Sequence, residues 1–374
     1  MKILFLTNSN IDSGFGSEAL LFSTARFLLN RGHHVSIMCT DKGGTRRAFS
    51  AELAGLGAGI TVVKRLSRGI PAYSGRWFLK IWREMSKCDI LYIMEPPPLI
   101  GFTSVVLLHL FRKPGIRGWH NPFYYQWDIN GGKPSFFLFR KMMRLLIMRM
   151  YLTLPAQKVE NSRQFGYLVK KYHGKPFFIT ACVEPPPHGS HTKYSKFTVL
   201  IMGRLNFHKG TDLIPELYSK FKSSLTDFQL IVVGSGPMAK KVRDMHNGKD
   251  FVYMDYVTDQ KKLDLLSGSH ALVALSRVEA FFMTGVEAMV HGTPLVSLRF
   301  PGPEDYISDG EDGFLCDGLD DIVNRLSLME SRLGTDWYTD MCMKAQIKGG
   351  KFTCPVVLPD IEKMFLEVGQ RGGS

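Results

Sequence analysis

The sequence has no long hydrophobic run, no closely spaced cysteines and few acidic residues in its first half. Its longest apolar stretch lies between Leu99 and Phe111 and is interrupted by His109. A helix that crosses a bilayer needs roughly 20 mostly apolar residues, so we predict a protein that does not span a membrane. The opening residues, Met1 to Thr7, are too few for the apolar core of a signal peptide and carry no cleavage site. We therefore expect a cytoplasmic protein.

The six cysteines fit the same location. None of them lies in a Cys-x-x-Cys pair, so the common zinc and redox motifs are missing. Cys39 and Cys182 fall inside apolar runs, where we expect reduced, buried thiols, as in a reducing cytosol. The sequence also contains no Asp-x-Asp motif that could hold a metal ion on a diphosphate. We therefore expect no bound metal.

Acidic residues are scarce only in the first half. Residues 1–185 contain 26 lysines and arginines and 10 aspartates and glutamates, which gives +16, whereas residues 186–374 contain 21 and 24, which gives −3. The first half therefore attracts anions, such as a phospholipid membrane, a lipid-linked phosphate or an acidic glycan. Residues 136–151 mix large apolar and basic side chains. That mixture suits a helix in a membrane interface or a half-buried helix covered by Arg and Lys stems.

Both halves alternate short apolar strands with amphipathic helices. In the first half we predict strands at 2–7, 34–40, 61–64, 89–94 and 115–120, and helices at 17–29, 74–85 and 135–150. In the second half we predict strands at 197–202, 228–233, 251–254, 271–275 and 294–297, and helices at 212–221, 236–245, 260–266 and 284–291. Near-continuous apolar strands joined by helices indicate parallel sheets covered on both faces. We expect an α/β protein of two doubly wound, Rossmann-like domains that face a cleft.

A proline-rich segment at 184–191 separates the halves, because it can continue neither a helix nor a central strand. The expected domains are 1–185 and 186–357, followed by a C-terminal segment at 358–374. Within that segment we predict a helix at 358–368 with Pro359 near its first turn and a loose tail from Gly369.

One loop carries two cations after a strand, in the run Gly203-Arg204-Leu205-Asn206-Phe207-His208-Lys209-Gly210. Arg204 falls at the carboxyl end of strand 197–202, the edge at which open α/β sheets bind ligands. We expect Gly210 to begin a helix whose amides add positive potential. A guanidinium and an ammonium suit a diphosphate. The alternative is a surface loop with solvated charges.

Two glutamates follow, eight residues apart. We expect Glu279 in the loop after strand 271–275 and Glu287 on the next helix, whose N-terminal amides at 282–284 would face an anion. Carboxylates accept hydrogen bonds from neighbouring hydroxyl groups, so the pair suggests a sugar ring and a ribose. Two solvated glutamates on a helix surface are the alternative.

Two features of the first half fit the same kind of ligand. Gly14-Phe15-Gly16-Ser17 precedes the first helix, and its glycines allow the backbone to approach a phosphate closely. His120 ends strand 115–120, where an imidazole could contact a sugar or relay a proton. An ordinary loop and a structural histidine are the alternatives.

Taken in order, these motifs resemble the retaining glycosyltransferases of family 4, which have the GT-B fold. The motifs that carry the resemblance are Gly14-x-Gly16, Leu28-Leu29-x-x-Gly32-His33-x-Val35, Gly203-Arg204 with Lys209-Gly210, Val233-Gly234-x-Gly236-Pro237, Ser276-Arg277-x-Glu279, Glu287-Ala288-Met289-x-x-Gly292-x-Pro294-x-Val296 and Asp309-Gly310-x-x-Gly313.

The resemblance implies a role for each matching position. Arg204, at the Gly203 corner, and Lys209 would clamp the diphosphate of a nucleotide sugar. Further donor contacts would come from Glu279 and the amides of Phe281, Phe282, Met283 and Thr284 for the sugar, Glu287 for the ribose, Val257 for the base, Gly14 and Gly16 for the phosphates, and His120 near the anomeric centre. The family usually has glycine at positions 280 and 282, where this sequence has alanine and phenylalanine, so the geometry of this loop is left open. The final helix would cross back to the first domain.

The resemblance also implies a reaction. A hexose, mannose or glucose, would move from a nucleoside diphosphate to a hydroxyl of a glycan or lipid-linked acceptor with retention, by front-face attack and without metal. GDP-mannose ranks ahead of UDP-glucose as the donor. Peripheral contact with an anionic membrane through the basic first domain would fit such an acceptor.

Other interpretations remain open. The run Gly234-Ser235-Gly236-Pro237-Met238-Ala239, with Asp255 after the next strand, imitates a dinucleotide-binding fingerprint, so an NAD-dependent oxidoreductase is the alternative enzyme. A nucleotide-sugar binder without activity is another alternative. The charge would permit nucleic-acid binding, but no nucleic-acid-binding motif is present, and we expect no such partner. The sequence leaves the oligomeric state open, a homodimer included.

Overall fold

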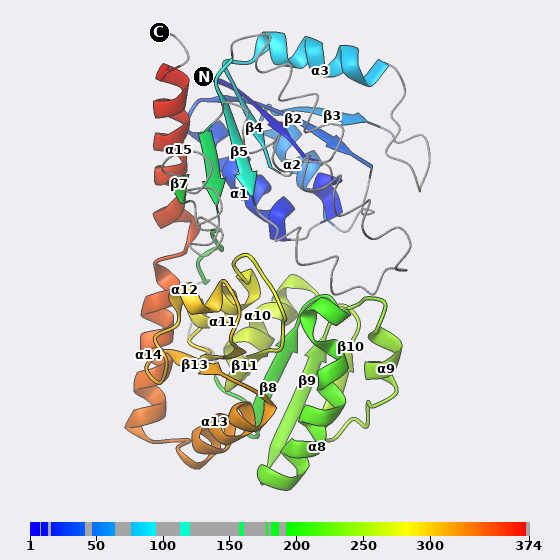
Figure 1. The fold of residues 1–374 in the computed structure, drawn as a ribbon, viewed down its shortest axis with the longest axis vertical. Helices are drawn as coiled ribbons and strands as arrows, with labels where there is room; N and C mark the ends of the chain where they lie inside the picture. Colours follow the sequence, from blue (N-terminus) through cyan, green and yellow to red (C-terminus); the bar gives the residue numbers. More distant parts are fainter. Residues whose placement is uncertain are drawn as a thin grey trace, which may run out of the picture. The chain divides into compact units, whose positions relative to one another are not determined.

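The computed structural model describes residues 1–7, 9–13, 16–41, 47–63, 76–94, 113–119, 157–160, 177–178, 181–186 and 192–371. The chain forms two compact units (Figure 1). Among the described residues, the first unit holds those up to Ala181 together with 357–371, and the second holds those within Cys182–Val356. None of the described helices is long and apolar enough to cross a membrane.

The first unit contains a seven-stranded parallel sheet in the order β3-β2-β1-β4-β5-β6-β7. Its strands are β1 (Lys2–Leu6), β2 (His34–Thr40), β3 (Gly59–Val63), β4 (Ile90–Ile93), β5 (Gly115–Trp119), β6 (Gln157–Glu160) and β7 (Phe177–Phe178). Its described helices before the last are the 3-10 helix η1 (Ile11–Ser13), α1 (Gly16–Asn30), α2 (Phe49–Gly55) and α3 (Arg76–Lys87). The five strands predicted here are confirmed to within two residues, whereas β6, β7 and α2 were not predicted.

The second unit repeats this topology with six parallel strands in the order β10-β9-β8-β11-β12-β13. Its strands are β8 (Phe197–Met202), β9 (Phe228–Val233), β10 (Phe251–Met254), β11 (Ala271–Ala274), β12 (Leu295–Leu298) and β13 (Gly313–Cys316). Its helices are η3 (Phe207–Lys209), η4 (Thr211–Leu213), α8 (Ile214–Ser224), α9 (Ala239–Arg243), α10 (Asp259–Gly268), α11 (Met283–Val290), α12 (Pro303–Tyr306), α13 (Leu319–Ser331) and α14 (Asp336–Gly350). The strands are apolar and buried almost throughout. Both faces of the sheet must therefore be covered, and helices cover them.

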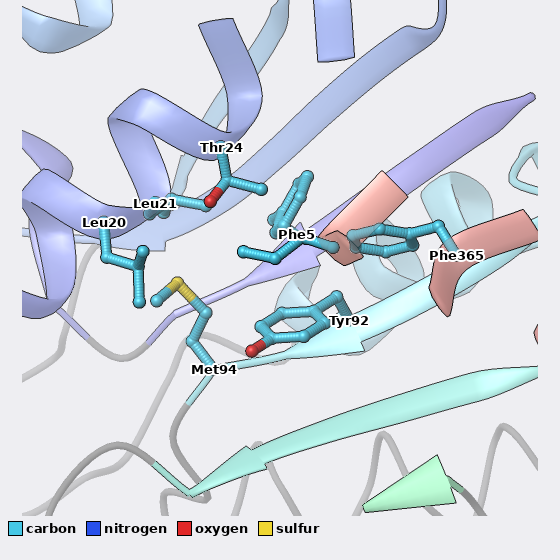
Figure 2. Close-up of a pocket in the computed structure, with 8 residues that line it drawn as sticks. Phe5, Leu20, Leu21, Thr24, Tyr92, Met94 and Phe365 are labelled. Atoms are coloured by element: carbon cyan, nitrogen blue, oxygen red, sulfur yellow. The ribbon is translucent and has the colours of Figure 1, made fainter. Parts of the chain in front are cut away.

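The last helix, α15 (Cys354–Arg371), packs against the sheet of the first unit. The Phe365 ring lies 5.7 Å from the rings of both Phe5 and Tyr92. Glu362 accepts hydrogen bonds from Arg31 at 3.3 Å and contacts His33 Nε2 at 3.0 Å. Figure 2 shows the apolar side chains around Phe365, which leave a cavity of about 10 Å³, room for no more than about one water molecule. This cavity is therefore part of the packing and not a substrate site.

Among the described helices, three differ from the prediction by more than two residues at one or both ends. The last helix begins at Cys354, not at 358, and continues to Arg371 through the predicted tail. Pro355 lies in its first turn, where a missing N–H costs little, so Pro359 falls inside the helix. The helix predicted at 236–245 shrinks to α9, because Gly236 has φ 157° and Pro237 follows. Gly210 does not begin a helix: it has φ 68° and joins η3 to η4, and α8 starts at Ile214.

Candidate functional site

The strand order of the second sheet reverses between β8 and β11. The chain builds outward from β8 to β9 and β10, and then returns to place β11 on the other side of β8. Open α/β sheets bind ligands at the carboxyl ends of the strands that flank such a reversal. The loop after β8 carries Arg204 and Lys209, and the loop after β11 carries Glu279. The fold therefore places the predicted cations and a predicted carboxylate at this one edge.

The loop after β8 is held in shape by close backbone contacts. A Cβ on Gly210 would meet the carbonyl oxygen of Leu275 at 2.1 Å, so only glycine fits there. The Asn206 side chain accepts from the amide of Lys209 at 3.0 Å and caps η3. Lys209 is thus presented by a turn with a defined backbone, and Arg204 is exposed where β8 ends.

Gly234 and Gly236 pack closely against the backbone of this same loop. A Cβ on Gly234 would meet the carbonyl oxygen of Gly203 at 1.8 Å, and one on Gly236 would meet that of Leu205 at 2.2 Å. Close packing against the residues around Arg204 accounts for both glycines. The helix that follows, α9, has five residues.

Lys209 and Glu279 form an ion pair between the two loops. The Lys209 ammonium contacts Oε1 of Glu279, which also accepts from the hydroxyl of Ser276 at 3.2 Å. The two side chains keep 30% and 18% of their surface exposed, so water and a ligand can reach them. The pairing explains how a carboxylate can lie beside the proposed diphosphate site without repelling an anion.

Arg277 ties the two loops together, a role that the sequence did not indicate. Its guanidinium makes two hydrogen bonds to the carboxylate of Asp212, at 2.8 and 2.7 Å, and lies 3.8 Å from the centre of the Phe207 ring. Its amide donates to the carbonyl of His208 at 2.8 Å. Burial raises the pKa of the Asp212 carboxyl, but the hydrogen bonds and charge of Arg277 outweigh it and leave the pKa below its usual value. A lasting Arg–carboxylate pair thus fixes the loop of Lys209 against that of Glu279.

The turn before α11 keeps an unusual backbone. Phe282 has φ 66° and ψ 66° and is the one non-glycine residue with positive φ among those that the structure describes. Its ring is buried and packs edge-on against Phe300 at 5.8 Å, and its carbonyl accepts from the hydroxyl of Tyr306 at 3.3 Å. Packing therefore holds a conformation that usually selects glycine. Phe282 is the N-cap of α11, so the amides of Met283 and Thr284 lie in its first turn, whereas Phe281 lies before the helix.

Glu287 lies one turn further along α11 and is paired with a residue that the sequence did not single out. The ammonium of Lys262, on α10, lies 2.6 Å from Oε1 of Glu287. Val257, the predicted contact for a base, lies just before Thr258, whose hydroxyl accepts from Lys261 N and caps α10. No sequence signal links positions 262 and 287, because only the packing of α10 on α11 makes them neighbours.

Few of the site residues predicted in the first unit fall within the described residues. Gly16 opens α1. Gly14, His120 and the segments 135–150 and 136–151 lie outside the described residues, so their predicted roles stay predictions. Among the described residues, no three His, Cys, Asp or Glu side chains come together as metal ligands do.

Comparison with known proteins finds a family match within the second unit. Residues 188–332 match the family model of the Glycosyl transferases group 1. The match covers less than half of the chain, which is similar to the group 1 glycosyltransferases over these residues. Its two Rossmann-like units have the GT-B fold.

Two curated relatives and one solved structure are also similar to this chain. The chain is 28% identical over 151 residues to a GDP-mannose-dependent alpha-mannosyltransferase of Corynebacterium glutamicum, and 31% identical over 149 residues to one of the subunits of the human phosphatidylinositol N-acetylglucosaminyltransferase. These matches cover 40% and 36% of this chain and 35% and 30% of those proteins, so the chain spans about a third of the length of the curated relatives that it matches. Anabaena Alr3699/HepE, solved with UDP and glucose, superposes with a TM-score of 0.74 at 18% identity, over 98% of this chain and all of that one.

Proposed function

We propose that this protein transfers a hexose from a nucleoside diphosphate sugar to a hydroxyl acceptor, with retention and without a metal ion. The observation that carries the proposal is the pairing of Lys209 with Glu279 at the strand-order reversal of a group 1 domain. One group suits the diphosphate and the other the sugar, and both lie on loops at the edge where such sheets bind ligands.

The proposed roles follow from charge and position. Arg204 and Lys209 neutralise the diphosphate and stabilise the negative charge that builds on it as the glycosidic bond breaks, each worth roughly 2.7–4 kcal/mol in the barrier. Glu279 accepts hydrogen bonds from the sugar and Glu287 from the ribose. The amides at 281–284, together with Gly203, Val257, Gly14 and Gly16, complete the donor contacts, and His120 serves the anomeric centre.

The proposed course is a front-face displacement. The acceptor hydroxyl attacks the anomeric carbon on the side from which the diphosphate leaves, and the departing phosphate oxygen takes the hydroxyl proton. The C–O bond to the diphosphate breaks as the new C–O bond forms, so the configuration is retained. The only acidic side chain assigned to the sugar, Glu279, is paired with Lys209, which favours a binding role over that of a nucleophile.

The donor that we favour is GDP-mannose, with UDP-glucose next. A relative that carries GDP-mannose in its name supports the first, and a structural neighbour solved with UDP-glucose supports the second. Titration calorimetry of the purified protein against GDP-mannose, UDP-glucose and NAD tests the choice. We expect one nucleotide sugar to bind and NAD not to bind. Binding of NAD with no binding of either nucleotide sugar would reinstate the oxidoreductase alternative.

We assign binding of the acceptor to the first unit. Its net charge suits a lipid-linked or glycan acceptor at an anionic membrane, where the protein would associate peripherally from the cytoplasm. The human relative acts, by its name, on phosphatidylinositol, which is a lipid acceptor of this kind. In this scheme residues 1–185 receive the acceptor, 186–357 bind the donor, and the segment from 358 packs back on the first domain.

A further inference from the structure

Helix α3 has a surface in which large apolar side chains adjoin a row of cations. Its inner side is formed by Ile81 and Met85, both completely buried. Leu79 and Trp82 lie outside this buried side and keep 65% and 44% of their surface exposed. In Figure 1, α3 runs along the outer edge of the first unit.

The cations of α3 line up beside the two apolar side chains. Lys80, Arg83 and Lys87 are exposed and are spaced three and four residues apart, which places them on one stripe of the helix. Leu79 and Trp82, three residues apart, form the neighbouring stripe. The single acidic residue of the helix, Glu84, is half-buried and lies 3.5 Å from Lys87.

We infer that this face of α3, made of Leu79, Lys80, Trp82, Arg83 and Lys87, docks the first unit on an anionic lipid surface. Leucine and tryptophan insert at the boundary between headgroups and acyl chains, and lysine and arginine attract anionic headgroups. A nucleic acid would satisfy the cations alone and would leave Leu79 in water. The two stripes together favour a membrane.

The inference deepens the proposed function, because it names the surface on which a lipid-linked acceptor would be met. Only the link to a lipid-linked acceptor rests on the proposed function. Vesicle binding is measured without donor or transfer, so its failure is distinguishable from a failure of the donor titrations.

The experiment is cosedimentation of the full chain with phosphatidylcholine vesicles, with and without phosphatidylglycerol. We expect binding only to the anionic vesicles, and less of it as salt is added. Lys80→Glu with Arg83→Glu should lower the partition coefficient by more than about tenfold, since each cation near the surface contributes about fivefold. The matched control is Lys249→Glu with Lys351→Glu, two exposed lysines of the second unit, which should leave binding unchanged.

The apolar stripe is tested separately. Leu79→Ser should weaken vesicle binding severalfold, whereas Ile347→Ser, at a residue of the second unit with 67% exposure, should not. Quenching of tryptophan fluorescence by brominated lipids should occur in the wild type and be lost in Trp82→Phe. All these variants must keep the thermal unfolding midpoint of the wild type.

Three results would overturn the inference. One is equal partitioning onto neutral and anionic vesicles. Another is an equal loss in both pairs of charge reversals, which would indicate only the overall charge. The third is tight, salt-sensitive binding of an RNA homopolymer that depends on Lys80 and Arg83 but not on Leu79 or Trp82, which would assign the surface to a nucleic acid.

Discussion

The ammonium of Lys209 and the carboxylate of Glu279 meet between the loops that follow β8 and β11, two strands that are neighbours in the sheet. The two groups are 70 residues apart in sequence and are brought together by the strand order. An ammonium has three N–H donors, so Lys209 can contact Oε1 of Glu279 and a diphosphate at the same time, while the carboxylate accepts from a sugar hydroxyl through its other oxygen. The pair can therefore serve the diphosphate and the sugar of one ligand together.

Removal of the Lys209 ammonium should greatly slow transfer and spare the fold. We expect Lys209→Ala to lower kcat/KM by roughly 10²–10³-fold, the usual effect of losing one preorganised contact to developing charge, with an unchanged circular dichroism spectrum. Arg204→Ala should behave alike. Lys249→Ala, at an exposed site in the same unit, is the control, and turnover near the wild-type rate in both site variants would contradict the assignment.

The pair of Lys262 and Glu287 should act as one unit in recognising ribose. Because Lys262 holds Oε1 of Glu287 at 2.6 Å, Lys262→Met and Glu287→Gln should each reduce the preference for a nucleoside diphosphate over its deoxyribose analogue. The double variant should lose no more than either single one, as coupled residues do. Lys261→Met, at the exposed neighbouring position, should keep the preference. Additive losses would show that the two residues act independently.

At position 282 a glycine variant should be more stable than an alanine variant, the reverse of the usual order. Alanine at 282 keeps the strained positive φ and glycine relieves it, so Phe282→Gly should unfold at about 1 kcal/mol higher free energy than Phe282→Ala. Both should be about 3 kcal/mol or more below the wild type, because a buried ring is lost. Phe281 is equally buried and has no positive φ, so there alanine should be the more stable. Urea unfolding of the four variants decides the point.

Stability should fall as the pH drops from 6.5 towards 4, because of His270. This ring is buried, and its Nδ1 accepts from Thr198 N at 3.0 Å. Burial, with a smaller contribution from the charge of Lys193, lowers the pKa of His270 from 6.5 to about 4. Below 6.5 the unfolded chain binds a proton that the folded chain does not, so the stabilisation is complete above 6.5 and is lost towards 4, by about 3 kcal/mol in all.

The measurement is urea unfolding at pH 7 and pH 4.5. His270→Asn, whose side-chain oxygen can replace Nδ1 as the acceptor, should remove most of the pH dependence. His246→Asn is the control, because His246 Nδ1 also accepts a backbone hydrogen bond, from Tyr253, but the ring is exposed. The same slope in wild type and His270→Asn would assign the pH dependence to other groups.

The sequence was most informative where one segment determines its own structure. Strands such as β8 and β9 are continuous apolar runs, so their existence and bounds could be predicted. β13 was missed because it is only four residues long and opens with glycine. The bounds of α15 were missed because Pro359 was read as a first-turn residue, although Pro355 fills that position.

Residues whose partners lie far away in the sequence could not be predicted from the sequence. Arg277 and Asp212 lie 65 residues apart, and Lys262 lies 25 residues before Glu287, so neither pair leaves a local pattern. The loop of Phe282 shows the same limit. The residue type argued against a left-handed turn, but packing against Phe300 and the hydrogen bond from Tyr306 hold that turn in place.

The central claim is that Lys209 binds a diphosphate while Glu279 binds the sugar attached to it. It is tested most directly by titration calorimetry of the preferred nucleotide sugar, and of the same nucleoside diphosphate without the sugar, into wild type, Lys209→Ala and Glu279→Gln. Lys209→Ala should weaken both ligands about equally, and Glu279→Gln should weaken only the nucleotide sugar. Wild-type affinity for both ligands in both variants would contradict the claim.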